Sequence, residues 1–532
     1  MTAFRNSLVV SNTPRVQADV ARLLSALAEA QAATAKSENE PPEVVVFPEA
    51  EPWRKKITDA LRQEVAIEFR ETPLQDVVAF LSDKSKIPML LDHPALNDVG
   101  IGGDTPVTRR VGNLSLRAAL RLIFKEMDLT YIIRDEVLLI TTPEEAESEL
   151  RTRIYPVADL LSPVAGNGDW LHAGDWRREA DYDLLIDVMM STIRPDIWDY
   201  VGGPGAHDAW GGCLVVYKTG EVLAELENLL AGMRRLQAKM KADPQAILTA
   251  PLQLDEIDHP AHAVLREKLA GEVGMLDFEK AGLFEVIEVL AKKHEAPIVI
   301  DYRALEDVGI DSSIPISATL GGESLSQALW RLTRPLDLHW VIREEVIFIT
   351  TPEEAESELL TWLYPVRDLV ASEDEMVTFY TGGDYDYLMD VVQQTVRPYS
   401  WEGVGGPGAI EPFGPSLCVV GAHTEDVHLE LVELLAKLRK AAAEDRAAKL
   451  EDDAQAEKPG EMQLKVYRLA NGERAVAEEL AEVVAELVEP ASWKAEESTY
   501  LKALQGAIIV RHQAAVHEKI GTLLGELDVL KW

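Results

Sequence analysis

At 532 residues the chain is long enough for several domains of about 100–200 residues each. Its apolar fraction of 47% is typical of packed globular domains, and its formal net charge of −39 disfavours nucleic-acid binding, because an acidic surface repels phosphate backbones and no basic stripe stands out. The sequence contains no apolar run of about 18 residues that would predict a membrane-spanning helix, and its first residues lack the apolar core of a signal peptide.

The N-terminal segment 1–34 predicts a strand, "SLVV" at 7–10, followed by an amphipathic helix. The same strand and helix close three later segments of the chain, so residues 1–34 are interpreted as the C-terminal half of a module. Half a module cannot bury its own sheet face. We therefore hypothesise that the protein or its ancestor extended upstream of Met1, where the rest of the module and an export signal would lie. Residues 35–53, rich in Pro and Glu, are predicted to be a linker.

Residues 54–152 form the first of two copies of one pattern, here called module A1; residues 261–361 are module A2. Each predicts the order β-α-β-β-α-β-β, from the strand "VAIEF" at 65–69 to the hairpin "LTYIIRDEVLLIT". In A1, Thr72, Pro73 and Gln75 predict the start of the first helix, with Thr72 as its cap.

The phrase "ITTPEEAESEL" occurs at 140–150 and again at 349–359, at the end of each A-module. A duplicated catalytic loop and a duplicated joint between domains are the two alternatives. A joint explains the identity without any chemistry, because the phrase predicts a short capped helix that fixes the angle between modules. The predicted inter-module caps are hydroxyl caps, first-turn prolines and capping-box glutamates: Thr142, Pro143, Glu145, Thr351, Pro352 and Glu354.

A second pattern, β-α-β-β-α, is predicted three times: module B1 at 153–241, module B2 at 362–440 and module B3 at 462–532. Residues 242–260 and 441–461 are predicted linkers, the latter extending the preceding helix as far as Pro459. Each first helix ends in a proline followed by a tryptophan: Trp198, Trp401 and Trp493. These three are candidate structural anchors or interaction positions. Tryptophan is enriched at binding hot spots, but its persistence in all copies favours packing.

Other motifs are interpreted as structural features and not as binding or catalytic sites. The turns "VGGPGA" at 201–206 and 404–409 lack the Lys-Ser/Thr of a phosphate loop. His207 and Cys213 are too few ligands for a zinc site, and the acidic run 382–390 lacks calcium-loop spacing. Cys213 and Cys418 lie one position out of register between copies and are interpreted as small core residues. We find no pairing of nucleophile and base, so no catalytic, metal-binding or cofactor-binding residue is predicted.

Together these patterns resemble the periplasmic part of secretins. The A-modules, with "PLQDVVAFLSDKSKIPMLLD" and "NLSLRAALRLIF", look like the secretin and TonB short N-terminal domain. The B-modules, best seen at 466–530, are similar to the ring-forming secretin N-terminal domain, whose shape is related to KH domains. The chain ends after a B-module, without the segment of a secretin β-barrel, so the resemblance does not imply a channel.

The resemblance implies an α+β protein of tandem small modules, elongated like beads on a string, with sheet faces and edges available to partners. It implies a non-enzymatic interaction scaffold of the periplasm or cell envelope, involved in protein secretion and able to form rings as a homo-oligomer with protein partners. The alternative is a sensory protein that relays a signal to a regulator, as TonB-linked receptors do. RNA binding would need a GxxG loop with basic neighbours, which these acidic modules lack.

Overall fold

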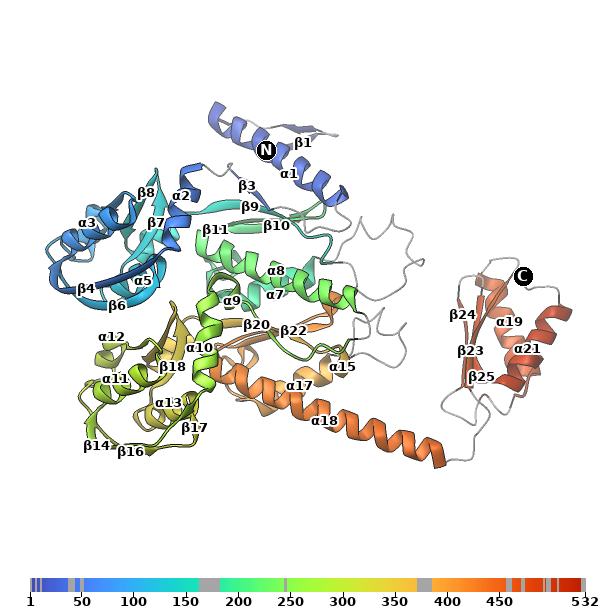
Figure 1. Ribbon diagram of the computed structural model, residues 1–532. Helices are drawn as coiled ribbons and strands as arrows, with labels where there is room; N and C mark the ends of the chain where they lie inside the picture. Colours follow the sequence, from blue (N-terminus) through green and yellow to red (C-terminus); the bar gives the residue numbers. More distant parts are fainter. Residues whose placement is uncertain are drawn as a thin grey trace. The chain divides into compact units, whose positions relative to one another are not determined.

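The computed structural model describes residues 2–4, 7–9, 12–36, 44–47, 52–161, 182–243, 246–370, 385–455, 462–469, 474–490, 493, 499–504 and 507–527. The chain divides into two compact units, Met1–Leu438 and Arg439–Trp532. Helices and small sheets alternate along both units (Figure 1), which confirms the predicted α+β class of tandem modules.

The strands of each A-module form separate small sheets, two in A1 and three in A2. In A1, β4 pairs with β6 and a separate sheet has the order β5-β8-β7. Leu74, Leu81 and Leu120 on its two main helices are fully buried in the core of the module. The elements of A1 are α2 (Pro52–Leu61), β4 (Glu64–Pro73), α3 (Leu74–Ser85), β5 (Met89–Leu91), α4 (His93–Asp98), β6 (Pro106–Ser115), α5 (Leu116–Lys125), β7 (Thr130–Arg134) and β8 (Val137–Thr141).

Module A2 repeats this arrangement, with β14 paired to β16 and a sheet of order β15-β19-β18, and it adds a short pair of strands, β13 and β17. Its elements are α10 (Pro260–Ala270), β13 (Glu272–Val273), β14 (Leu276–Gly282), α11 (Leu283–His294), β15 (Ile298–Ile300), α12 (Tyr302–Asp307), β16 (Pro315–Leu320), β17 (Glu323–Ser324), α13 (Leu325–Thr333), β18 (His339–Arg343) and β19 (Val346–Thr350).

The predicted cap of the first A1 helix is wrong. Thr72 lies inside β4, and α3 begins at Leu74 without a side-chain cap. The first amide groups of α3 donate instead to backbone carbonyls of the loop before β6, Leu74 to Thr105 and Gln75 to Gly103, both at 2.9 Å. Because the loop satisfies these amides, a hydroxyl cap is not required.

The B-modules have the predicted β-α-β-β-α order. B1 contains β9 (Arg151–Pro156), α7 (Asp183–Thr192), β10 (Ala206–Trp210), β11 (Cys213–Lys218) and α8 (Gly220–Ala242). B2 contains β20 (Leu360–Pro365), α17 (Asp386–Thr395), β21 (Ala409–Phe413), β22 (Cys418–His423) and α18 (Glu425–Gln455). B3 contains β23 (Met462–Arg468), α19 (Arg474–Leu487), β24 (Tyr500–Leu504), β25 (Ala507–Gln513) and α21 (Ala514–Glu526).

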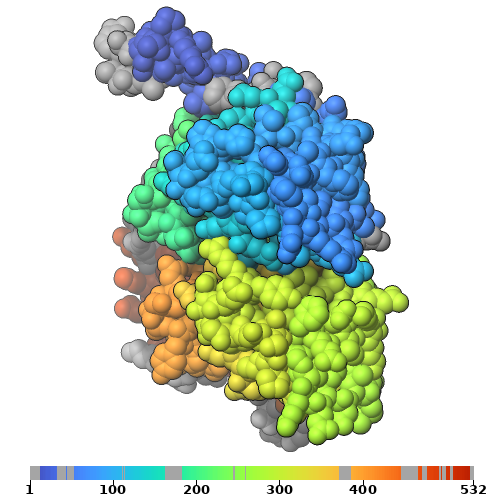
Figure 2. Space-filling model, turned by 90° about the vertical axis from the view of Figure 1, so that its left-hand side faces the viewer, coloured from blue at the N-terminus to red at the C-terminus, as the bar shows by residue number. Residues whose placement is uncertain are grey.

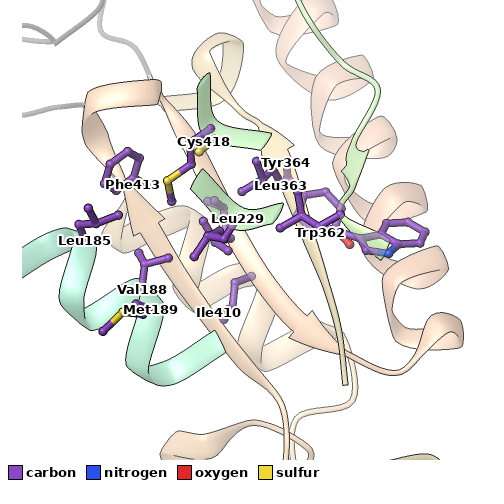
Figure 3. Packing of buried hydrophobic residues seen from close by; sticks show 14 of the residues in the cluster. Leu185, Val188, Met189, Leu229, Trp362, Leu363, Tyr364, Ile410, Phe413 and Cys418 are labelled. Carbon is purple, nitrogen blue, oxygen red and sulfur yellow. The ribbon is translucent and has the colours of Figure 1, made fainter. Parts of the chain in front are cut away.

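Within the first unit, the B-modules stack in layers and are not separate beads. The helices α7 and α8 cover the sheet of B1 and also lie against the sheet of B2, where α7 contacts β21 and α8 contacts β20 (Figure 1). Figure 3 shows Leu185, Val188 and Met189 of α7 beside β21, the strand that carries Ile410 and Phe413. One apolar core therefore runs through both modules, because the helices of B1 are apolar on two faces.

The N-terminal segment adds a further layer to this stack. The hairpin of β1 (Thr2–Phe4) and β2 (Ser7–Val9) precedes α1 (Pro14–Lys36), which packs on the outer face of the B1 sheet. There Ala26 and Ala30 of α1 meet Ile154 and Cys213. The helix of the half-module thus buries its apolar stripe on the next module.

The two A-modules also share a core. Val341, Val346 and Phe348 of A2 join the buried cluster of A1. Figure 2 shows the two modules packed together on one face of the molecule, A1 in blue and A2 in yellow-green. The expected separation of the modules is therefore wrong for the first unit, because their apolar surfaces are buried on each other.

Candidate functional site

The three tryptophans occupy one structural position. The indole N–H of Trp198 donates to the carbonyl of Ile193 at 2.8 Å, that of Trp401 to Val396 at 2.7 Å, and that of Trp493 to Val488 at 2.7 Å. Each bond closes the C-terminal end of the preceding helix, where carbonyl groups lack helical partners. Trp198 and Trp401 are buried and Trp493 is half-buried. The geometry is that of an internal anchor, and it leaves the buried pair no surface to offer a partner.

In each B-module, a residue at or next to the C-terminal end of the last strand packs on the tryptophan. Lys218 lies 4.6 Å from the Trp198 ring, and the imidazoles of His423 and His512 meet Trp401 and Trp493 edge-on. The Lys218 ammonium donates to the carbonyl of Ile197 at 2.6 Å, so its charge is held inside the turn.

The glycine-rich turns wrap around the same tryptophans. The amide of Gly203 donates to the carbonyl of Trp198 at 2.9 Å, and Gly406 donates to Trp401 at 3.0 Å. A side chain on Gly203 would collide with the backbone of Ile197. These glycines are thus required by close backbone approach. The turns leave Val201 and Val404 at equivalent, exposed positions, an apolar surface that the sequence did not predict.

The predicted inter-module caps lie at the starts of α6 (Pro143–Glu147) and α14 (Pro352–Glu356). The hydroxyl of Thr142 accepts from the amide of Glu145 at 3.4 Å, and that of Thr351 accepts from Glu354 at 3.3 Å. The prolines stand at the first helical position in both.

The glutamate side chains differ between the copies. Glu145 pairs with Arg134 of its own module at 3.0 Å, whereas Glu354 pairs at 2.6 Å with Lys125 of A1. The second copy of the phrase therefore contacts a neighbouring A-module as well as joining its own to B2.

The hairpin turn of A2 is fastened to A1 by two glutamates. Glu344 pairs with Arg121 at 2.6 Å, and Arg121 also pairs with Glu221 of B1 at 2.6 Å, so one guanidinium links three modules. The carboxylate of Glu345 accepts from the amide of Ser115 at 2.8 Å. Burial alone would raise the pKa of Glu345, but hydrogen bonds with His259 and Ser115 outweigh it and lower the pKa to about 2.

A second cluster of charges joins A2 to B2 around Arg266 of α10. Its guanidinium holds Glu425, the first residue of α18, in a bidentate pair at 2.8 and 2.9 Å, and it contacts Asp255 at 2.8 Å. His262 lies 2.7 Å from the same Asp255 carboxylate. Burial raises the pKa of Glu425, and Arg266 opposes that shift. These acidic and basic side chains pair with one another, so the cluster stabilises the contact between A2 and B2.

A tyrosine–histidine pair recurs in B2 and B3 and is fully buried in B2. The Tyr364 hydroxyl lies 2.6 Å from Nδ1 of His428, whose Nε2 lies 2.7 Å from the carbonyl of Leu360. Burial lowers the pKa of His428 to about 3, so the ring is neutral, with Nε2–H donating and Nδ1 accepting. The cavity beside Tyr364 is lined by apolar side chains such as Leu388, Ile410 and Leu431. With both ring nitrogens engaged, the pair holds α18 on its sheet.

The remaining candidates are placed as follows. No group of three potential metal ligands occurs among the residues that the structure describes, and His207 packs edge-on against Trp198. Cys213 and Cys418 are buried and not disulfide-bonded. They face Pro156 and Pro365 at equivalent ladder positions, which corrects the predicted offset between them. Most of the acidic run 382–390 is helical from Asp386, and its first residues lie outside the described part. Among the described helices, none is long and apolar enough to cross a membrane.

The predicted linkers 35–53 and 242–260 contain strands. β3 (Val45–Phe47) adds antiparallel to β9, and β12 (Leu252–Gln253) adds antiparallel to β20, giving sheets of order β10-β11-β9-β3 and β12-β20-β22-β21. Each linker thus supplies an edge strand to a B-module: residues 35–53 to B1, and residues 242–260 to B2. In the described part of B3, the sheet has three strands, β23-β25-β24.

The sequence matches no family model and no curated protein. Among solved structures, it is similar to the N-terminal domain of the secretin XcpQ from Pseudomonas aeruginosa, with 13% identity, covering 48% of this chain and 100% of that chain at a TM-score of 0.12. It is also similar to a chain of the Salmonella SPI-1 type III secretion injectisome basal body (InvG, PrgH and PrgK), with 12% identity, covering 48% and 46% of the two chains at a TM-score of 0.15.

A third similar structure is the GspC–GspD complex of the type II secretion system of enterotoxigenic Escherichia coli, with 13% identity, covering 33% of this chain and 99% of that chain at a TM-score of 0.11. At these identities and TM-scores, the similarity carries no argument about what this chain does.

Proposed function

We propose that the chain is a non-enzymatic protein–protein interaction scaffold of the bacterial cell envelope, working with secretion components as the periplasmic part of secretins does. The observation that carries the proposal is the binding of an extended segment along the first strand of B1 and of B2. Backbone pairing at a sheet edge, with shape complementarity around it, is a general mode of protein recognition that needs no catalytic residues.

The contacts between neighbouring modules support the same proposal. Charged clusters around Arg121 and Arg266 hold the A-modules against their neighbours, so the first unit presents a fixed set of surfaces. Small αβ modules with complementary faces associate into symmetric assemblies when the same contact repeats between copies. The predicted domain limits, the periplasmic location and a homo-oligomeric ring belong to this proposal.

Size-exclusion chromatography with light scattering tests the proposal across protein concentration and salt. We expect one defined oligomer whose mass is a multiple of the 58.8 kDa chain. Recovery of the protein from the periplasmic fraction after osmotic shock would support the location. A strict monomer at every concentration that binds a single regulatory protein would contradict the scaffold and favour signal relay.

A further inference from the structure

The first strand of B3 differs from its two counterparts. β9 lies between β11 and β3, and β20 lies between β22 and β12. Among the described residues, β23 pairs with β25 on one side and with no strand on the other. The edge that the chain fills with its own linker in B1 and B2 is therefore open in the described part of B3.

The backbone groups that face this edge follow from the second module. The amide of Leu254 donates to the carbonyl of Thr361 at 3.2 Å, so Thr361 and, two residues on, Leu363 point their backbone groups toward β12. Tyr364 and Tyr467 are equivalent, since each hydroxyl lies beside a histidine of the last helix, at 2.6 and 3.0 Å. Counting back from Tyr467, the backbone groups of Leu464 and Val466 face the open edge of β23.

The side-chain exposure of the residue at the equivalent position of the first strand also differs between B3 and the other two B-modules. Ile154 of β9 and Leu363 of β20 are 0% exposed, whereas Val466 of β23 is 52% exposed. Ile154 is covered by α1, and Leu363 lies beneath α8 and opposite β12. In the described part of B3, the side chain of Val466 is thus half exposed on the sheet face that α1 and α8 cover in the other modules, beside backbone groups that pair with no described strand.

We propose that β23 binds an extended, acid-flanked apolar segment of a partner protein, added antiparallel along the backbone of Leu464 and Val466. The inference rests on the proposed scaffold function and names its partner chemistry. Both segments that fill the equivalent edges are apolar with acidic neighbours: "EVVVFPEAE" around β3 has acids on both sides, and "LQLDEID" around β12 has them on its C-terminal side. The exposed side chains of Lys465 and Arg468 lie along β23, and they complement acidic flanks.

Pairing of β23 with β23 of a second copy is disfavoured by the same charges. A two-fold antiparallel contact centred on this strand would bring the Lys465 side chains of both copies together, and like charges on neighbouring strands are destabilising. The open edge of β23 is therefore better suited to an acidic partner segment than to β23 of a second copy.

The probe is a fluorescent peptide of residues 40–52, EPPEVVVFPEAEP, titrated into the full chain and followed by anisotropy. In Val466→Pro the amide that faces the open edge is lost, while the bonds to β25 made by the alternate residues remain. We expect this variant to bind at least about tenfold more weakly, and Val466→Thr, which keeps the amide, to stay within about twofold of the parent. Matching far-ultraviolet circular dichroism and melting of the variants verifies that both are folded.

Two proline-substituted peptides separate backbone pairing from charge. Val45 and Phe47 occupy hydrogen-bonded positions opposite β9, whereas Val46 points its amide away. The Val45→Pro peptide should therefore lose binding, and the Val46→Pro peptide, of equal charge, should retain it.

Equal affinity of the parent chain and Val466→Pro for the peptide would overturn the inference, and so would equal binding of the two proline peptides or no binding at all. The light-scattering experiment is independent of these titrations. A defined oligomer that does not bind the peptide would contradict the proposed edge site and agree with the proposed scaffold function. A strict monomer would contradict the scaffold function.

Discussion

Gly232 of α8 lies directly against Leu363 of β20, so closely that a β-carbon on the glycine would stand 2.9 Å from Cδ1 of that leucine. The same β-carbon would also collide with Leu254. The glycine is therefore what allows a helix of B1 to approach the sheet of B2, at the expense of about 1 kcal/mol of helix propensity relative to alanine.

Gly232→Val should separate the two modules. Overpacking of this kind costs about 1–3 kcal/mol, and a β-branched residue recovers only part of the helix propensity. Urea unfolding followed by tryptophan fluorescence measures the loss. The matched control is Gly521→Ala in α21, where nothing lies within 4 Å, and this control should gain up to about 1 kcal/mol. Equal stability of Gly232→Val and the parent would contradict the close contact between modules.

Trp401→Phe should destabilise B2 by about 1–3 kcal/mol, because the buried carbonyl of Val396 loses the indole donor. Trp401→Ala should cost more, about 3–5 kcal/mol, since the ring is also lost from the core. Thermal unfolding compares both with Trp330→Phe, a side chain that is 40% exposed, where a change within about 0.5 kcal/mol is expected. If the Trp401→Phe and Trp330→Phe variants melt alike, the helix-closing role of the indole is wrong.

Arg266→Met should destabilise the A2–B2 contact by about 3–5 kcal/mol, because the side chain of Glu425 is only 2% exposed and keeps its charge without a partner. Arg266→Met combined with Glu425→Gln should recover part of the loss. An exposed pair, Lys437–Glu433, supplies the control: Lys437→Met should change stability by less than about 1 kcal/mol. Chemical denaturation of the parent chain, Arg266→Met, Glu425→Gln and the double variant measures the coupling, and strict additivity would contradict a shared ion pair.

The buried histidines of B2 predict a dependence of stability on pH. Burial lowers the pKa of His428 to about 3 and that of His423 to about 4. In the unfolded chain both titrate at about 6.5. Between these values the unfolded chain binds more protons than the folded one, so stability is full above about pH 6.5 and falls as the pH decreases toward 4 and 3.

His428→Gln should flatten this decrease, because the proton that His428 takes up on unfolding is no longer bound. Melting temperatures between pH 7 and about pH 4 measure the slope. The comparison is His93→Gln, a substitution in A1 that leaves both buried histidines of B2 in place. An unchanged slope in His428→Gln would mean that this imidazole is not held neutral by the fold.

Much of the local structure could be predicted from apolar spacing. The strand–helix order of the A- and B-modules follows from periodicity, and the Thr142 and Thr351 hydroxyls stand where the capping pattern puts them. Such patterns succeed because a helix or strand must bury one stripe of its own residues.

The relations between modules could not be predicted in the same way. Leu223 and Leu230 are buried although they lie about 80–100° around α8 from its main apolar stripe, and the small residue Gly232 lies on the other side of that stripe. These residues indicate a second packed surface that periodicity alone did not separate from the first. The short strands β3 and β12 lie in Pro- and acid-rich stretches that are typical of linkers. Their pairing depends on the edge of a distant module, which local sequence does not encode.

Hydrogen exchange of single backbone amides tests the central claim, that the first strand of a B-module is a site for strand addition. The amides of Ile154 and Leu363 face β3 and β12, so they should exchange slowly, whereas the amide of Val466 should exchange quickly until the 40–52 peptide is added. Equal, slow exchange at all three positions without peptide, or fast exchange at Ile154 and Leu363, would contradict the account.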